Sequence, residues 1–269
     1  GDRTIVPRDE SPRHETSGPL RRADFASFEL RDLDRVDDFP LYVWNTYHVP
    51  ILNGKDRGVL REIPPYMLST VDEVVRRSRG EFSVHAEVFS PFTHFMELFG
   101  YEEAMLALLD DPEKAGAILE RLTGASTALA QAYAARGVDA LLVSSAFAGA
   151  GFISRDHYER FVLPHERALI LKLRKTAPAL PIYTHTCGAI GDRLDLMEAT
   201  GLDGIDTLDP PPLGTVELVE AKRRFGNRLF LKGNVDSIHT LLEKDLAGCE
   251  ADLARTLAIG KPGGAYIFS

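Results

Sequence analysis

Beyond residue 110, short apolar runs alternate with longer stretches in which hydrophobic residues recur every three or four positions. The short runs have the length of buried strands, and the longer stretches have the period of helices that cover one face of a sheet. This pattern predicts strands at 140–144, 181–184, 204–208, 229–232 and 265–268, and helices at 111–136, 154–176, 189–200, 216–225 and 244–259. Such strand–helix repeats predict a parallel sheet covered by helices.

Two more strands are predicted upstream, at 41–44 and 82–88, with a helix at 71–79 between them. Residues 82–88 alternate between apolar and polar side chains, so His85 and Glu87 share one face of their strand. Seven predicted strands leave an eight-stranded barrel one strand short, and the simplest explanation is an N-terminal strand that this chain lacks.

The residues that follow the strands distinguish a closed barrel from an open doubly wound sheet. Polar side chains cluster just past the strand ends, among them Ser144, His185, Asp206 and Asn234, and no glycine-rich nucleotide-binding loop follows a strand. Barrel enzymes place their chemistry at the carboxyl ends of their strands. The chain is therefore predicted to have an α/β fold of the (β/α)8 TIM-barrel type.

Residues 1–38 differ in composition from the rest of the chain. Asp, Glu, Arg, Pro and Ser crowd this segment, and only a few apolar side chains, such as Phe25, Phe28 and Leu33, could anchor it. We predict an extended polar arm or lid at 1–38 and a barrel domain at 39–269. Because the chain opens on Gly1 and stops at the end of an apolar run, we expect a processed or partial form of a longer protein.

Composition and charge narrow the class of partner. The net charge of -9 argues against nucleic acid or an anionic membrane surface as the main partner. No apolar run approaches the roughly 20 residues that span a bilayer. Two cysteines in a chain of 269 residues make no disulfide framework, so we expect a reducing, cytoplasmic location.

The strongest candidate for chemistry is the pair His185 and Cys187. Residues two apart on a strand point the same way, so an imidazole and a thiol would converge here. Both groups suit Zn²⁺, and a catalytic zinc site needs one more protein ligand and an open position. Spacing alone leaves open an inert cysteine beside a hydrogen-bonded histidine. Cys249 is expected to be a core residue rather than the third ligand, because it shares a helical stripe with four leucines between 242 and 257.

Three motifs together resemble the uroporphyrinogen decarboxylase superfamily. They are Ser-Arg-Asp-His-Tyr-Glu-Arg-Phe-Val-Leu-Pro at 154–164, the turn His185-Thr186-Cys187-Gly188, and Leu-Lys-Gly-Asn-Val-Asp at 231–236. The resemblance runs from about residue 82 to the end of the chain and implies a (β/α)8 barrel with its site at the strand C-termini. The superfamily contains decarboxylases of haem biosynthesis and zinc-dependent methyltransferases that act with corrinoid proteins.

The methyltransferase branch carries a His-x-Cys turn that matches His185 and Cys187, and a further cysteine after the last strand completes its zinc site. The resemblance thus implies methyl transfer between a corrinoid protein and a thiol or similar small acceptor, with zinc on His185 and Cys187 and the corrinoid carried by a partner protein. It is also compatible with a homodimer.

The decarboxylase branch is the alternative, and it would need no cofactor. Its members use an Arg-rich N-terminal segment with an adjacent Asp, and a C-terminal His, and residues 1–60 contain no equivalent of that segment. Ser144 stands where these enzymes tend to carry Asp, which counts against the porphyrin reaction. A third alternative is a non-catalytic barrel that serves as the partner of a corrinoid protein.

The other candidate site residues lie near strand ends: Glu87, Ser144, Tyr183, Asn234 and Asp236. Glu87 would be a fourth zinc ligand or a general base, and the other four would contact substrate. Four of them have a structural alternative: a solvated carboxylate at a strand end for Glu87, packing for Tyr183, a strand-to-helix turn for Asn234, and capping of the following helix for Asp236. Asp206 and Asp209 flank a strand end and are expected to shape the proline-rich loop that follows.

Overall fold

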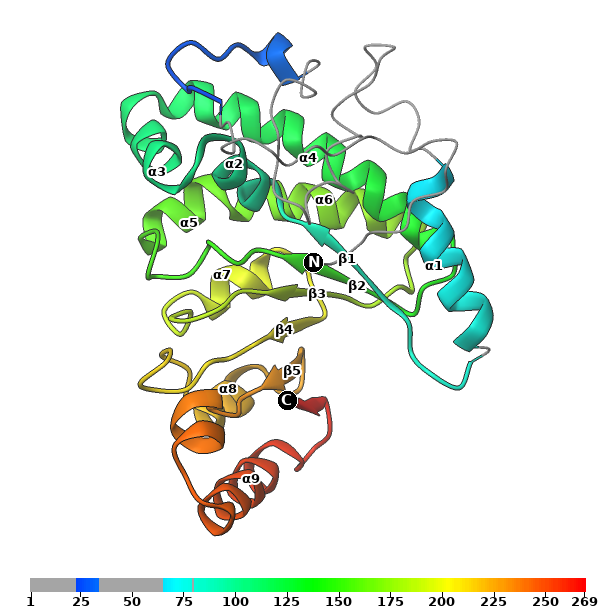
Figure 1. Cartoon of the computed structure of the whole chain (residues 1–269), viewed down its shortest axis with the longest axis vertical. Coiled ribbons are helices and arrows are strands. Elements are labelled where there is room, and N and C mark those ends of the chain that lie inside the picture. The colour runs from blue at the N-terminus through cyan, green and yellow to red at the C-terminus, as the bar shows by residue number, and fades with distance from the viewer. Residues whose placement is uncertain (1–22, 34–64, 79) are drawn as a thin grey trace, which may run out of the picture.

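The computed structural model describes residues 23–33, 65–78 and 80–269. The strand predicted at 41–44 lies outside the described residues. Within them, six strands form one parallel sheet in chain order: β1 (His85–Phe89), β2 (Ala140–Ser144), β3 (Ile182–His185), β4 (Gly204–Asp206), β5 (Phe230–Gly233) and β6 (Tyr266–Phe268). Figure 1 shows β1 to β5 stacked in this order down the molecule. This is the α/β architecture that the sequence predicts, and it corresponds to part of a TIM barrel.

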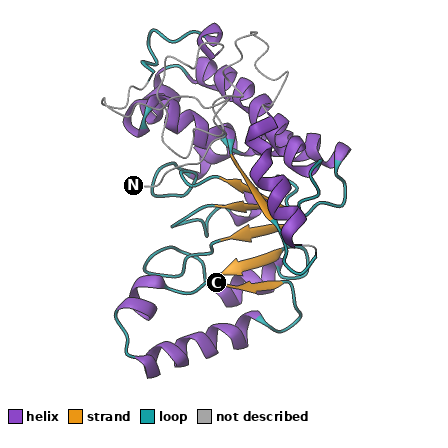
Figure 2. Ribbon diagram, turned by 45° about the vertical axis from the view of Figure 1, so that its right-hand side comes forward, coloured by secondary structure: helices purple, strands orange, loops and turns teal. Residues whose placement is uncertain are grey.

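Helices precede and connect the strands: α1 (Pro65–Ser78), α2 (Pro91–Phe99), α3 (Tyr101–Asp110), α4 (Pro112–Ala134), α5 (Arg155–Phe161), α6 (Leu163–Thr176), α7 (Leu194–Ala199), α8 (Leu218–Phe225), the π-helix η4 (Ser237–Leu242) and α9 (Leu246–Gly260). The strand arrows in Figure 2 point to one edge of the sheet, from which the loops after the strands emerge. Among the helices described, none is long and apolar enough to cross a membrane.

The two faces of the sheet carry different side chains. One face packs against helices and presents Val88, Leu141, Val143, Ile182 and Ile205, each at most 1% exposed. Alternation along the strands sends polar side chains to the opposite face. The register makes neighbours of four of them in successive strands: Ser144, His185, Asp206 and Lys232.

Several helix boundaries differ from the prediction. Helices α2 and α3 were not predicted, and every residue of α2 is buried, so this helix has no polar face to give an amphipathic pattern. The helix predicted at 154–176 is divided into α5 and α6. Pro164 lies in the first turn of α6 and has no N–H with which to continue the hydrogen bonds of α5. The helix predicted at 189–200 begins only at Leu194.

The prediction that Cys249 lies in a buried leucine stripe is wrong. Leu242 and Leu246 are 77% and 75% exposed, whereas Cys249 is partly buried and its thiol donates to the carbonyl oxygen of Thr240 at 2.9 Å. The buried side of α9 instead carries Asp252, which is 8% exposed and is paired with cations. Because Asp252 is charged, the spacing of leucines in the sequence does not mark the side of α9 that is buried, and the predicted buried face is the wrong one.

Residues 23–33 are the described part of the predicted arm, and they pack against α2. Phe25, Phe28 and Leu33 are buried, and the rings of Phe25 and Phe28 meet that of Phe99 edge-on. This segment therefore contributes to the hydrophobic core. The boundary between arm and barrel at 38/39 lies outside the described residues and stays a prediction.

Candidate active site

Three polar side chains form a row across the carboxyl ends of β3, β4 and β5: His185, Asp206 and Lys232. In the register of the sheet, Asp206 lies between His185 and Lys232. One of its carboxylate oxygens, Oδ2, accepts from His185 Nδ1 at 3.2 Å and from the Lys232 ammonium at 2.8 Å. The row therefore fixes the imidazole in one orientation, with Nδ1 turned to the carboxylate and Nε2 turned away.

The outward ring nitrogen of His185 meets the thiol of Cys187. Nε2 and Sγ lie 3.1 Å apart, and Cys187 is exposed to solvent. The two side chains converge because they are two residues apart at the end of a strand. The structure thus brings the two candidate metal ligands together at an accessible position, and their role as ligands stays a prediction.

Burial and charge set the electrostatics of this row. The hydrogen bond to Asp206, followed by that to Cys187, raises the pKa of His185 to about 10 against the opposing effect of burial. Burial tends to raise the pKa of Asp206, but the bonds from His185 and Lys232 outweigh it, and the pKa falls below its ordinary value. The carboxylate is thus held ionised although its side chain is only 3% exposed.

The loops after β2, β3 and β4 pack closely around the cysteine. A Cβ added to Gly149 would lie 2.8 Å from the carbonyl oxygen of Cys187, and one added to Gly214 would lie 2.6 Å from that of Gly188. The backbone N–H of Gly188 donates to Asp209 at 2.6 Å. Asp209 therefore links the loop after β4 to the loop after β3, and glycine at 149 and 214 lets three neighbouring loops touch through their backbones.

Three other predicted residues lie on the same face of the sheet as His185. The Tyr183 hydroxyl is 2.8 Å from Nδ1 of His85, and this contact places both side chains near β1 and β3. Ser144 is buried beside His185 in the register, and Glu87 is exposed on β1. No three His, Cys, Asp or Glu side chains come together as a ready-made metal site in the described ranges.

Asn234 and Asp236 are held by other contacts. The Asn234 amide donates to the carbonyl oxygens of Leu208 and Val216, so it fastens the loop after β4. Asp236 accepts from the first backbone N–H groups of η4 and caps that helix, which was the structural alternative for this residue. Both residues line a cavity formed by that loop, η4 and α9.

Asp206 and Lys232 are site residues that the sequence did not predict. Asp206 was expected only to shape a loop, and no role was expected for Lys232. The available signal was their position at strand ends next to that of His185, but the register that aligns them is a property of the folded sheet.

The residues present fit two ligands of a zinc site. His185 Nε2 and Cys187 Sγ face one region, and Asp206 binds the opposite ring nitrogen, as carboxylates commonly do behind a metal-binding histidine. Oδ1 of Asp206 is buried without a hydrogen-bond partner among the residues described, so this carboxylate keeps acceptor capacity beside the imidazole.

A comparison with family models identifies the family of the chain. The model described as "Uroporphyrinogen decarboxylase (URO-D)" matches residues 51–269. The chain belongs to the uroporphyrinogen decarboxylase family. The match confirms the resemblance that the sequence motifs indicated. In this member of the family, the row of His185, Asp206 and Lys232 lies at the carboxyl ends of the strands.

Relatives of this URO-D family chain are named for two different activities. It is 28% identical over 230 residues to uroporphyrinogen decarboxylase of Alkalilimnicola ehrlichii, covering 82% of this chain and 59% of that protein. It is 27% identical over 174 residues to methylated-thiol–coenzyme M methyltransferase of Methanosarcina mazei, covering 65% of this chain and 44% of the relative.

A solved structure with a similar fold is a methyltransferase from Methanosarcina mazei, with a TM-score of 0.65 and 19% identity. The match covers 80% of this chain and 60% of the other. The chain thus spans no more than about three fifths of the length of these relatives. Members of both named activities are enzymes, and the comparisons leave the type of reaction open.

Proposed function

We propose that this chain belongs to an enzyme that transfers a methyl group between a corrinoid protein and a thiol or similar small acceptor, with zinc held by His185 and Cys187. The observation that carries the proposal is the 3.1 Å approach of Nε2 to Sγ at an exposed position, with Asp206 on the opposite ring nitrogen. The methyltransferases among the sequence and structural relatives support it.

A zinc ion at this position would supply a Lewis acid that keeps an acceptor thiol deprotonated near neutral pH. The protein side chains prepare that position. Asp206 accepts the proton of Nδ1 and so fixes Nε2 as the nitrogen that faces the metal position, and Lys232 offsets the charge of the carboxylate. Because the pKa of His185 is about 10, Nε2 would lose its proton to displacement when zinc binds. In the reaction, a carbon–sulfur bond forms while the bond between the methyl carbon and its donor breaks, and the electron pair of the broken bond stays on the donor.

The remaining predicted residues receive roles by their place on the same face. Ser144 and Tyr183 would contact the acceptor, because both lie beside His185 on β2 and β3. Glu87 is exposed on that face and is the candidate general base. These roles follow from position and need mutational tests.

Zinc content tests the proposal directly. His185→Ala and Cys187→Ala should each lower the zinc bound per chain, measured by elemental analysis after dialysis, while the circular dichroism melt stays close to that of the wild type. Cys249→Ala is the matched control, because it removes the other cysteine, on α9. Full zinc retention by both site variants would exclude these two residues as ligands.

A second measurement addresses the reaction. Methylcobalamin can stand in for the corrinoid protein, and its demethylation in the presence of 2-mercaptoethanol can be followed by absorbance. We expect the wild type and Cys249→Ala to accelerate this reaction and Cys187→Ala to lose the acceleration. Equal rates with and without the wild-type protein would contradict the proposed activity.

Uroporphyrinogen decarboxylation is the second candidate, because a relative with this name aligns over 82% of the chain. It predicts carbon dioxide release from uroporphyrinogen under anaerobic conditions without added metal. Release that persists in Cys187→Ala would favour the decarboxylase and disfavour methyl transfer.

A further inference from the structure

A cavity whose lining includes neither His185 nor Cys187 lies between the loop after β4, η4 and α9. It has a volume of about 320 Å³, within the size range of small-molecule sites. Part of its lining is apolar: Val216 and Leu218 come from the segment that leads into α8, and Leu253 and Ile259 come from α9. The cavity could therefore hold the apolar body of a small ligand.

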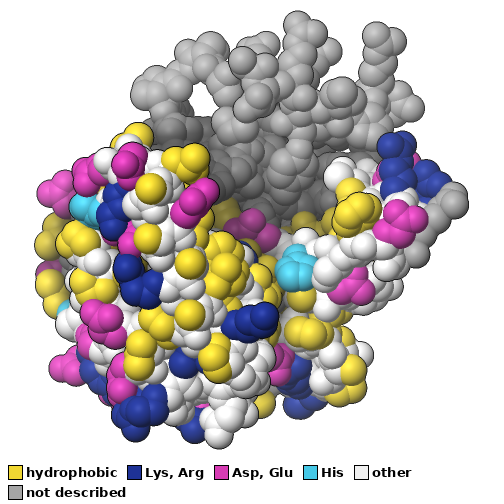
Figure 3. Space-filling model, turned by 90° about the horizontal axis from the view of Figure 1, so that it is seen from below, with side chains coloured by type: hydrophobic (Ala, Val, Ile, Leu, Met, Phe, Trp, Pro, Cys, Tyr) yellow, Lys and Arg dark blue, Asp and Glu magenta, His cyan; other side chains and the backbone are white. Residues whose placement is uncertain are grey.

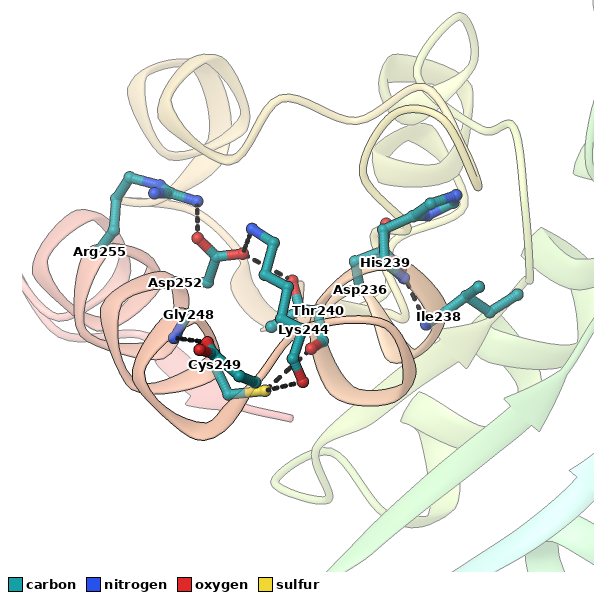
Figure 4. Close-up of polar contacts among 10 residues, drawn as sticks. Asp236, Ile238, His239, Thr240, Lys244, Gly248, Cys249, Asp252 and Arg255 are labelled. Atoms are coloured by element: carbon teal, nitrogen blue, oxygen red, sulfur yellow. Dashed lines mark hydrogen bonds and ion pairs between the residues drawn. The ribbon is translucent and has the colours of Figure 1, made fainter.

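Two basic side chains also line the cavity, and both contact Asp252. Figure 4 shows Lys244 and Arg255 both reaching Asp252. Arg255 donates to Oδ1 at 2.6 Å, and Oδ2 accepts from Lys244 and, at 2.9 Å, from Thr240. These contacts, led by Lys244, lower the pKa of Asp252 to about 2, so the carboxylate stays ionised. Two cations on one carboxylate leave a local excess of one positive charge.

Around Asp252, hydrogen-bond donors outnumber the free acceptors. The acceptors of Asp252 are occupied by three donors, whereas Lys244 and Arg255 each use one of several N–H groups on this carboxylate. Asp236 is also occupied, by two backbone N–H groups and by the ring of His239 at 2.8 Å. At the Asp252 end of the cavity, Lys244 and Arg255 thus keep spare donors, whereas the carboxylate oxygens of Asp252 and Asp236 are engaged.

Two lining residues oppose this local excess. Asp236 is a carboxylate already engaged by η4 and His239, and Glu217 is exposed just before α8 and adds a second negative charge at the cavity. The face seen in Figure 3 has acidic, basic and hydrophobic side chains intermixed, without a broad field of one sign. An anion would therefore be held by the two local cations and not by long-range attraction.

We propose that this cavity binds a small organic anion, whose carboxylate or phosphate head contacts Lys244 and Arg255 and whose apolar body lies against α8 and α9. Charge-assisted hydrogen bonds from an ammonium and a guanidinium are well suited to such a head group. The site is separate from the proposed zinc ligands and does not depend on the proposed reaction.

Matched probes test the charge preference. Ligand-observed NMR titrations of the full chain would use 3-phenylpropionate, phenyl phosphate and 3-phenylpropylamine, which pair a similar apolar body with different heads. We expect at least one of the two anions to bind saturably and the amine to bind at least about tenfold more weakly. Binding of the amine with equal or higher affinity would overturn the proposal, as would no saturable binding of either anion.

Variants locate the site. Lys244→Gln and Arg255→Gln should each raise the Kd of the anion about tenfold, and Glu217→Gln should lower it, because it removes a repelling charge without removing a contact. Arg223→Gln is the control, since Arg223 pairs with Glu220 on the exposed side of α8 and does not line the cavity. Unchanged affinity in both Lys244→Gln and Arg255→Gln would overturn the proposal. Zinc content should be unaffected in all four variants, which separates this result from the fate of the proposed function.

Discussion

Glu166, on α6, allows a quantitative test of the structure. Its side chain is 1% exposed, and its Oε1 lacks a hydrogen-bond partner of good geometry within the described part of the chain. Burial raises the pKa of Glu166 from 4.5 to about 7, although the hydroxyls of Ser145 and Tyr158 moderate the rise. Each pKa unit corresponds to about 1.4 kcal/mol, so ionising this buried group costs the folded state about 3 kcal/mol.

The sign of the pH dependence follows from the two protonation equilibria. The folded chain keeps the Glu166 proton up to a pH of about 7, whereas the unfolded chain releases it near 4.5. Between these values the unfolded state binds fewer protons, so the free energy of unfolding falls as pH rises through this window. The full cost is present above pH 7 and absent below the unfolded pKa.

Glu166→Gln removes the charge and should remove this dependence. Urea unfolding followed by circular dichroism should show the advantage of Glu166→Gln over the wild type widening by about 2–3 kcal/mol between pH 5 and pH 8. Glu159→Gln, at an exposed position on α5, is the control and should follow the wild type at every pH. A constant difference between Glu166→Gln and the wild type across this range would refute the argument from burial.

Three further predictions concern packing and the site. Leu122→Ala, at a fully buried position of α4, should lower the free energy of unfolding by about 3 kcal/mol in urea titrations. The control Leu242→Ala, at a position 77% exposed, should change it by less than about 0.5 kcal/mol. Similar losses in the two variants would contradict the burial of Leu122. Gly149→Ala should cost about 1–3 kcal/mol because its methyl group meets a backbone oxygen at 2.8 Å, whereas Gly116→Ala, with open space around it in α4, should gain up to about 1 kcal/mol. Asp206→Asn should weaken zinc binding about 10–100-fold in a chelator competition, because the imidazole loses its orienting carboxylate; an unchanged affinity would remove Asp206 from this role.

Much of the fold is available from local patterns in the sequence. Strand β2 is predicted with its observed bounds, because a short apolar run between a glycine-ended helix and polar residues has few other solutions. Helix α2 is missed for the opposite reason, since burial on all sides erases the periodic contrast by which helices are recognised. In α9, the hydrophobic pattern predicts the wrong buried face, because the buried residue Asp252 is charged. Its charge is balanced by Lys244 and Arg255, and a hydrophobicity pattern does not contain such contacts.

The candidate site also contains residues that local sequence patterns predict and residues that they do not. His185 and Cys187 are found because they are two residues apart where one strand ends, so their proximity follows from local spacing. Asp206 and Lys232 contribute through pairing between strands, which local spacing does not specify. Asp236 was named as a substrate contact with helix capping as the alternative, and the structure shows the capping contacts.

The backbone contacts at Gly149 and Gly214 have a practical consequence for redesign. Three successive loops rest on one another with no side chain between them, so a change in the length or course of one loop would displace the next. Grafting a single loop from a relative to alter substrate preference would then disturb the position of the Cys187 thiol. Exchange of all three segments as a block would preserve their mutual fit.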